Sequence, residues 1–314
     1  MNTHVLRIAF AALALVTAAA TAADFHVATN GNDIDPGTRE KPFATPGRAM
    51  EAVRALVSGG LKSDVHVVLR GGTYAPKAPL LFTSADSGSA DHAITYAAAS
   101  GETAVISGGR EITNWTPVGG SNWTAELAGV KSGQWFFRHL VVNDQRAVRA
   151  RWPNEDGVLH LASVDNEVKS FTFDRALPQE NLGSQDAELV VYENWSVSRA
   201  LIISSDQRQL ATATPVGWIG HGAMTTASPG KPAFIEHSRA ALDQAREWFL
   251  DRSTGTLTYF AAAGEKPAQT VAVAPVLTQL VKITGTKDKP VRNVRFEGLH
   301  FEHTDFALPT IGYS

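Results

Sequence analysis

The sequence predicts an all-β solenoid of short stacked strands, interrupted by a long insertion of a different kind. Two runs of brief apolar strands, residues 65–109 and 279–303, follow the same pattern with glycine at the corners. Glycine lets the backbone turn after only a few residues, as coiled strands require. The region between the runs, about 110–274, carries hairpin signals instead. We therefore expect four parts: 1–23, 24–109, 110–274 and 275–314.

Residues 1–23 have the pattern of a signal peptide. Arg7 follows a polar start, residues 8–16 form an apolar run too short to span a bilayer, and residues 20–23 are small, as a cleavage site requires. We expect the mature protein to be secreted or periplasmic, with no membrane association after cleavage. A retained N-terminal anchor is the alternative, which the small-residue ending disfavours.

Residues 24–60 predict a strand, a turn cluster and a capping helix. Residues 25–28 form the strand, Thr45 is an N-cap, and Pro46 occupies the first helical position. Apolar residues then recur at helical spacing until Gly59 ends the helix. Such a helix would cover the open end of the stack, which otherwise exposes unpaired apolar rungs.

The turn cluster holds Asp33 and Asp35, whose oxygens are of the kind that bind calcium. Aspartate in a Gly/Pro turn more often accepts hydrogen bonds from its own backbone. We therefore expect no metal and no cofactor, with calcium as the weaker alternative.

The solenoid strands are too short to bury their apolar faces alone. In the early run they are residues 65–69, 79–82, 93–96 and 104–107, and in the late run 280–283, 294–296 and 299–301. We therefore expect the two runs to stack as adjacent parallel rungs despite the insertion between them.

The insertion predicts antiparallel hairpins. Asn143-Asp144 and residues 253–255 are turn signals between apolar pairs, and further alternating strands occupy 189–192, 196–204 and 210–213. A short helix is expected around 239–244. Hairpins at this density suggest a β-sandwich or barrel-like module.

Composition excludes several functions. The chain has 314 residues, a net charge of −3 and no basic run, so nucleic acid is not an expected partner. It contains no cysteine, which rules out thiol catalysis and thiolate zinc sites. It also lacks a Gly-x-Ser-x-Gly elbow, a His-Glu-x-x-His motif, a Walker loop and a dinucleotide fingerprint.

Several blocks resemble a known family. The motif FHVATNGND at 25–33, followed by PGTREKPF at 36–43, resembles the N-terminal motif of secreted right-handed parallel β-helix proteins, as do LRGGTY at 69–74 and residues 101–109. Other blocks are similar to β-helix proteins akin to glycoside hydrolase family 141. These are 135–154, 192–195, 247–259 and 296–305. The resemblance covers nearly the whole mature chain; one departure is Gln244-Ala245-Arg246, where relatives usually carry a Pro-Gly turn.

The resemblance implies a right-handed parallel β-helix with an N-terminal capping helix, incomplete coils and the inserted module. It implies the N-terminal part of an exported glycoside hydrolase that binds polysaccharide or oligosaccharide, monomeric when full length. Catalytic carboxylates of that group are expected mainly on later coils, so we expect this chain alone to be inactive and prone to association. The alternatives are a non-catalytic carbohydrate-binding or surface β-helix protein, and a polysaccharide lyase on the same scaffold.

The last block holds the candidate catalytic residues. If its apolar residues point inward, alternation sends His300 and Glu302 to the outer face, with His303 and Asp305 in the following turn. Glu302, His303 and Asp305 are suited to assist glycosidic proton transfer, and His300 to contact substrate. A solvated outer face is the alternative.

The insertion holds candidate sugar contacts. Glu193, Trp195 and Trp135 are the types of residue that line sugar clefts, as are three further residues. The three are Trp152, Trp218 and His221. Core packing is the alternative for each tryptophan taken alone. Arg146, Arg149 and Arg151 are expected to share one face of a strand, where they would suit carboxylated sugars or, as we favour, pair with acidic residues.

Overall fold

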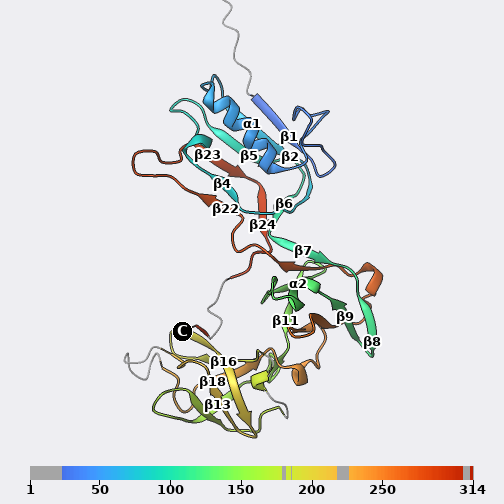
Figure 1. Cartoon of the computed structure of the whole chain (residues 1–314), viewed down its shortest axis with the longest axis vertical. Coiled ribbons are helices and arrows are strands. Elements are labelled where there is room, and N and C mark those ends of the chain that lie inside the picture. The colour runs from blue at the N-terminus through green and yellow to red at the C-terminus, as the bar shows by residue number, and fades with distance from the viewer. Residues whose placement is uncertain (1–22, 179–181, 185, 218–225, 307–311, 314) are drawn as a thin grey trace, which may run out of the picture. The chain divides into compact units, whose positions relative to one another are not determined.

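The structure is a computed structural model that describes residues 23–178, 182–184, 186–217, 226–306 and 312–313. The chain is all-β, with 41% strand and 10% helix. It divides into two compact units (Figure 1). Unit 1 comprises the described residues of Met1–Gly72, Leu81–Ala104 and Ile283–Leu299, and unit 2 those of Thr73–Leu80, Val105–Lys282 and His300–Ser314. The expected signal peptide lies outside the described residues apart from its last position.

Unit 1 contains a parallel sheet that joins the two ends of the sequence. Its order is β1 (Ala23–Val27), β2 (Val65–Leu69), β5 (Ile94–Ala98) and β23 (Val294–Glu297), and every neighbouring pair is parallel. Ile94 lies opposite Val65 on one side and opposite Val294 on the other. The predicted pairing of the late run with the early run is therefore confirmed for β23 and β5.

Two smaller sheets also link early and late strands. One pairs β4 (Leu80–Phe82) with β22 (Val281–Ile283); the other has the order β24 (Leu299–Glu302), β6 (Ala104–Ser107), β3 (Gly72–Tyr74). The short strands predicted between glycine corners are thus formed at their expected places.

The helix predicted to begin at Pro46 and to end at Gly59 is confirmed as α1 (Pro46–Ser58). The Thr45 side chain accepts a hydrogen bond from the Arg48 N–H, and Gly59 is the C-cap. Its buried face packs on β1 and β2. Asp33 accepts hydrogen bonds from the N–H groups of Ala44 and Thr45 at 2.8 and 2.9 Å, so its carboxylate organises the turn that leads into α1.

Unit 2 contains a curled half-barrel sheet (Figure 1). Its strand order is β7 (Gly109–Ile112), β21 (Ala272–Pro275), β10 (Leu140–Val142), β11 (Gln145–Arg149), β19 (Glu247–Asp251), β20 (Thr256–Phe260), β9 (Asn122–Glu126), β8 (Thr116–Gly119). The pairs are antiparallel except β11 with β19. An aromatic-rich core lies against the sheet, and Trp248, Tyr259 and Phe137 are fully buried in it.

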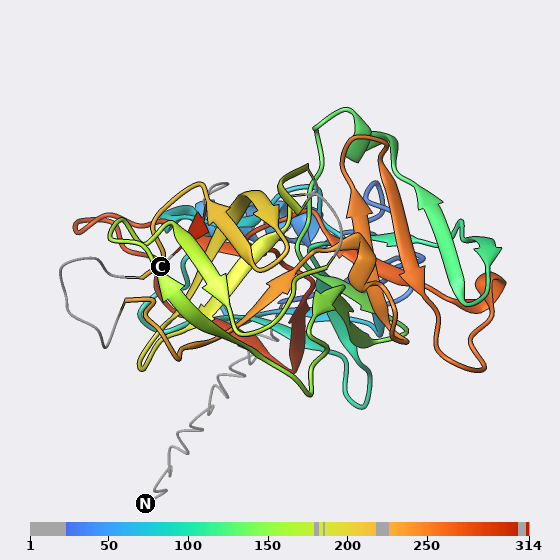
Figure 2. The same ribbon diagram turned by 90° about the horizontal axis from the view of Figure 1, so that it is seen from below.

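The second sheet of unit 2 closes into a six-strand barrel within the described residues. The circuit is β18 (Pro232–Glu236), β13 (Leu159–Val164), β14 (Ser170–Phe173), β17 (Gln209–Thr212), β16 (Val197–Asp206), β15 (Glu188–Tyr192). It closes because β15 pairs with both β16 and β18. β12 (Arg151–Trp152) pairs with β18, and β25 (Gly312–Tyr313) pairs with β16. Figure 2 shows the lime and yellow barrel strands gathered together. Of the sandwich and the barrel considered from sequence, this sheet is a barrel.

Local turn signals in the insertion were mostly correct. Asn143 and Asp144 have φ of 49° and 58° and join β10 to β11, as a two-residue hairpin turn requires. The helix predicted around 239–244 was wrong beyond its first turn, since only the 3-10 turn η3 (Arg239–Ala241) forms. The Glu247 carboxylate accepts hydrogen bonds from the N–H groups of Asp243 and Gln244, both at 3.0 Å, so these groups do not continue a helix.

The departure noted at 244–246 has a structural counterpart. Arg246 has a φ of +75°, in the left-handed region that favours glycine. Its guanidinium donates to the side-chain oxygen of Gln145 and to the Val142 carbonyl, which ties this turn to the β10–β11 hairpin.

Among the described residues, no helix is both long and apolar enough to cross a membrane.

Candidate functional site

An arginine-rich cavity of about 790 Å³ lies in unit 2, and we call it the arginine cavity. Its charged wall comes from the segment before β10, from β11 and β12, and from the barrel strands β16 and β18. The charged and imidazole side chains on this wall are Arg138, His139, Arg146, Arg149, Arg151, Glu155, Arg199 and Glu236. Val197, Phe234 and Phe306 add apolar surface.

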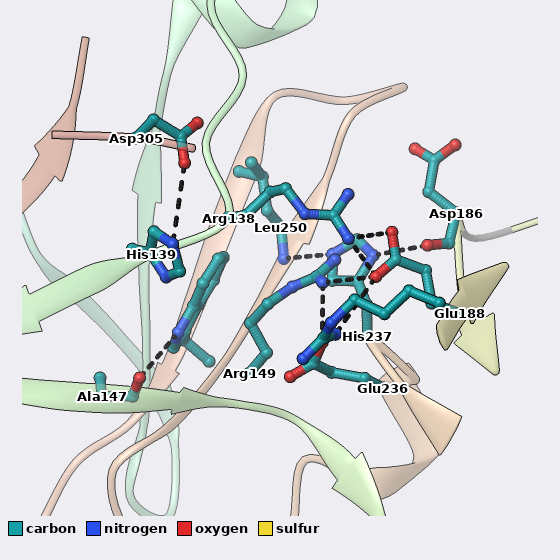
Figure 3. Close-up of polar contacts among 12 residues, drawn as sticks. Arg138, His139, Ala147, Arg149, Asp186, Glu188, Glu236, His237, Leu250 and Asp305 are labelled. Atoms are coloured by element: carbon teal, nitrogen blue, oxygen red, sulfur yellow. Dashed lines mark hydrogen bonds and ion pairs between the residues drawn. The ribbon is translucent and has the colours of Figure 1, made fainter. Parts of the chain in front are cut away.

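Arg149 occupies the centre of an ion-pair cluster beside this cavity (Figure 3). Its Nη1 donates to Glu188 Oε2 and to Glu236 Oε2, both at 3.1 Å. Arg138 donates to both oxygens of Glu188, and Arg199 donates to Glu236. Burial alone would raise the pKa of Glu188, but the charge of Arg149 and the bonds from Arg138 outweigh it and lower this pKa to about 2. Glu188 is therefore ionised at neutral pH.

His139 is held neutral at the edge of the same cavity. Arg146 Nη2 lies 2.7 Å from His139 Nδ1, and because a guanidinium can only donate, Nδ1 accepts and the ring proton lies on Nε2. That nitrogen is 3.9 Å from Asp305 Oδ1 (Figure 3). Burial, then the charge of Arg146, lowers the pKa of His139.

His237 supports the cluster from behind (Figure 3). Its Nε2 accepts a hydrogen bond from the Leu250 N–H at 3.2 Å, so Nδ1 carries the proton and donates to the Asp186 carbonyl at 3.3 Å. Burial, followed by the charge of Arg149, lowers the pKa of His237 to about 3. A neutral imidazole thus bridges β19 of the half-barrel and Asp186, two residues before β15.

A second cavity of unit 2, about 680 Å³, contains two of the predicted catalytic residues. We call it the Glu302 cavity. Glu302 and His303 line it together with Ser107, Glu111 and other residues. Ser107 Oγ lies 2.9 Å from His303 Nδ1, and His303 Nε2 lies 3.8 Å from Glu302 Oε2.

The Glu302 carboxylate lies between two imidazoles. His300 Nδ1 is 3.4 Å from Glu302 Oε1, whereas His303 approaches the other carboxylate oxygen, Oε2. The Glu302 side chain is 43% exposed, whereas His303 is 11% exposed and held by Ser107. A half-exposed carboxyl group flanked by imidazoles can exchange a proton with a bound molecule.

The other predicted residues lie elsewhere. Asp305 contacts His139 and not the Glu302 cavity. Trp135 is a core residue, 8% exposed, whose Nε1 donates to the Pro275 carbonyl. Trp195 is 76% exposed between β15 and β16, and the neighbouring Glu193 is 8% exposed; neither lines the two cavities. Trp218 and His221 fall outside the described residues.

The predicted arginine face needs correction. Arg146 and Arg149 belong to β11 and are three residues apart, so a regular strand directs them to opposite faces, and Arg151 belongs to β12. All three nevertheless line the arginine cavity. Only Arg149 forms the acid pairing that we favoured: Arg146 contacts His139, and Arg151 donates to the carbonyls of Pro153 and Gly157.

Sequence reasoning missed several residues of these sites. Glu188, Glu236, Arg138 and Arg199 come from four separate segments that only barrel closure and domain packing bring together. Ser107 lies on a predicted strand, β6, and Glu111 lies on β7, which follows it in the sequence. Neither residue belongs to a chemical motif that the sequence would reveal. In the described part of the chain, no group of three or more His, Asp or Glu side chains is arranged to hold a metal ion.

Comparisons with known proteins agree with this architecture. Residues 120–262 match the family model described as the GH141 insertion domain, which spans β9 through β20 and the whole barrel. A solved structure titled "Glycoside hydrolase" aligns with 93% of this chain and 53% of its own, at 26% identity and a TM-score of 0.80. This chain therefore spans about half the length of that protein.

Weaker likenesses were also found. The structure titled "The complex structure of XylC with xylose" aligns with 91% of this chain and 36% of its own, at 16% identity and a TM-score of 0.39. A comparison with curated protein sequences gives no match.

The fold and these comparisons define an all-β protein related to glycoside hydrolases. More particularly, residues 120–262 resemble the GH141 insertion domain, and this match takes in β9, β10, β11, β19 and β20 of the half-barrel together with the barrel.

Proposed function

We propose that this chain belongs to an exported enzyme that hydrolyses a polysaccharide, and that the Glu302 cavity contacts the sugar chain. The observation that carries the proposal is the likeness to a glycoside hydrolase over 93% of this chain, at a TM-score of 0.80 and 26% identity. The carboxylate of Glu302, half exposed at a cavity wall, is the kind of group that glycoside hydrolysis uses.

We further propose that unit 1 is the beginning of a right-handed parallel β-helix. The parallel order β1-β2-β5-β23, with Val65, Ile94 and Val294 in line, supports this, because coils of a β-helix repeat at a fixed register. Export is proposed from the pattern of residues 1–23. N-terminal sequencing of protein recovered outside the cytoplasm would test it, with a start near Asp24 expected, and sedimentation would test our proposal that the full-length enzyme is a monomer.

In the proposed reaction, Glu302 exchanges a proton with the glycosidic oxygen or with the attacking water. Ser107 fixes the orientation of the His303 ring at 2.9 Å, and the ring faces Glu302 at 3.8 Å. Hydrolysis with two carboxylates requires a second acid, and Glu111 is on the wall of the same cavity. We assign Glu302 the proton-transfer role and propose Glu111 as the second carboxylate.

The test is the release of reducing ends by the full-length enzyme from a panel of neutral and acidic polysaccharides. Glu302→Gln should lower turnover by about 10²- to 10⁴-fold, as loss of a general acid or base does. Glu297→Gln, an exposed glutamate on β23, is the matched control and should leave turnover unchanged.

Other results would point elsewhere. Unchanged turnover in Glu302→Gln would remove Glu302 from the mechanism. Binding without release of reducing ends would favour a carbohydrate-binding protein. Unsaturated, ultraviolet-absorbing products would indicate a lyase. If the protein neither binds nor cleaves any saccharide, the proposed function itself is overturned.

A further inference from the structure

The arginine cavity has more positive than negative charge. Five arginines of the described residues line it, and they face three glutamates: Glu155 and Glu236 on the wall and Glu188 behind Arg149. With His139 neutral, the formal charge is +2, and it stays positive even if Asp305 beyond His139 is counted. The whole chain carries −3, so this positive charge is a local feature and not the average of the protein.

Within the part of the chain that the structure describes, two of the five guanidiniums contact only neutral groups. Arg146 donates to the neutral ring of His139 at 2.7 Å. Arg151 donates to the Pro153 carbonyl at 3.0 Å and lies 3.7 Å from the ring centroid of Phe234. Their charge is therefore not cancelled by a carboxylate, in contrast with that of Arg138, Arg149 and Arg199.

Arg149 adds a second observation that points to a ligand. It is 5% exposed, lines the cavity, and has an Nε–H with no hydrogen-bond partner. A buried guanidinium N–H without a partner costs free energy, and such groups are uncommon unless they have a role. Glu188 and Glu236 fix the Nη1 side of this guanidinium, so its orientation is set before any molecule binds.

The apolar part of the wall suits a sugar ring. Phe306 lines the cavity and is 61% exposed, and Phe234 and Val197 lie on the same wall. Sugars bind proteins through aromatic contacts to their apolar faces and hydrogen bonds to their polar groups. The cavity volume of about 790 Å³ lies within the range of ligand sites.

Resting on the function proposed above, we infer that the arginine cavity is a binding subsite for the carboxylate of a uronic-acid residue in the polysaccharide. The planar fork of a guanidinium matches a carboxylate with two parallel hydrogen bonds, and Arg146 and Arg151 supply uncompensated charge beside it. The subsite thus selects acidic over neutral sugar chains, separately from proton transfer in the Glu302 cavity.

The test is calorimetric titration of the whole chain with oligosaccharides of galacturonate, glucuronate and mannuronate. Each is compared with its carboxyl-reduced counterpart, which keeps the ring and removes the charge. At least one uronate oligosaccharide should bind about ten-fold or more tightly than its reduced counterpart, and added salt should weaken that preference. A sulfated galactan oligosaccharide is the third arm.

Variants locate the effect. Arg146→Gln and Arg151→Gln should each weaken uronate binding by about ten- to hundred-fold and leave binding of the reduced oligosaccharide unchanged. Arg175→Gln is the matched control. Arg175 follows β14 of the barrel, is exposed, pairs with Asp174 and does not line the arginine cavity. The control variant removes the same charge and should bind as the wild type does. Because Arg146 is exposed, we expect Arg146→Gln to fold as the wild type does, and circular dichroism checks this.

The inference is overturned if reduced and acidic oligosaccharides bind equally, if the sulfated chain is preferred, or if folded Arg146→Gln and Arg151→Gln bind uronate as the wild type does. In each of these cases a saccharide still binds, so the proposed function survives. Failure to bind any saccharide, neutral or acidic, would overturn both.

Discussion

Glu188 illustrates how much a single side chain contributes when its charge is buried. Its carboxylate accepts hydrogen bonds from Arg138 and Arg149, with Arg199 3.6 Å away, and its side chain is 9% exposed. Removing one member of a buried ion-pair cluster leaves the partners as uncompensated charges.

Glu188→Gln should therefore destabilise the protein by about 3–5 kcal/mol, measured by chemical denaturation near pH 7. The control is Asp186→Asn, two positions before Glu188 in the sequence. It removes an exposed ion pair with Arg252 and should cost less than about 1 kcal/mol. Similar losses of unfolding free energy in both variants would show that the buried ion pairs of Glu188 stabilise the protein no more than the exposed pair of Asp186 does.

His237 gives a pH-dependent prediction. Its folded-state pKa of about 3 lies below the unfolded value near 6.5, so the unfolded state takes up the proton first as pH falls. The stabilisation is complete above pH 6.5 and is lost progressively between 6.5 and 3. Between pH 7.5 and 5.0 this group should account for a loss of about 2 kcal/mol.

His237→Gln tests this, because the glutamine carbonyl can accept the Leu250 N–H without titrating. The variant should lose less stability than the wild type over the same pH range, in paired urea denaturations. The lowered pKa of His139 acts in both proteins and cancels. Equal losses in the two would mean that His237 is not the group that titrates.

At the scale of elements, the β19–β20 turn packs tightly against α2 (Ala128–Lys131). Gly255 in this turn has a φ of +79°, and a Cβ there would lie 2.7 Å from Lys131 Cβ and 2.8 Å from the Leu127 carbonyl oxygen. Gly230 has a similar φ of +85° with nothing within 4 Å. Substitution by alanine should therefore cost the same backbone strain at both glycines. Only at Gly255 would the added Cβ also collide with α2 and the residue before it.

Gly230→Ala should cost about 1–2 kcal/mol, the penalty of a left-handed residue, whereas Gly255→Ala should cost about 1–3 kcal/mol more. Thermal melts of the two variants and the wild type measure this difference. Equal melting temperatures would mean that the turn moves away from α2 without cost.

Elements with local signals were predictable from sequence. The Thr45-Pro46 start of α1 and the Asn143-Asp144 hairpin form as expected, since each depends on a few neighbouring residues. The barrel could not be predicted in detail, because its closure pairs residues 188–191 with 233–236. The lost helix after Ala241 has the same explanation: a single carboxylate, that of Glu247, takes the N–H groups that a helix would have used.

The candidate sites were predictable only in part, for the same reason. Glu302 was found by alternation within one strand and His303 by its place in the turn that follows, but Ser107, the partner of His303, is nearly 200 residues earlier. Asp305 was grouped with them by proximity in sequence and instead faces His139. The arginines of β11 were identified, whereas the glutamates that hold Arg149 come from the barrel and carry no local motif.

At the scale of the whole molecule, the two units have separate cores although the chain passes repeatedly between them. Unit 1 buries Val67, Leu69 and Ile94 in a parallel sheet whose strands come from both ends of the sequence. Unit 2 buries one cluster against the half-barrel and another inside the barrel. A unit with its own buried core can unfold as its own cooperative transition.

Scanning calorimetry should therefore resolve two transitions, and matched Leu→Ala substitutions should assign them. Leu69 in β2 and Leu161 in β13 are 0% and 2% exposed, so each variant removes the same atoms from an equally buried position, one in each unit. Each should destabilise its own unit by about 2–5 kcal/mol. Leu69→Ala should lower one transition temperature and Leu161→Ala the other. A single transition lowered by both variants would instead mean that the repeated chain crossings couple the two cores into one folding unit.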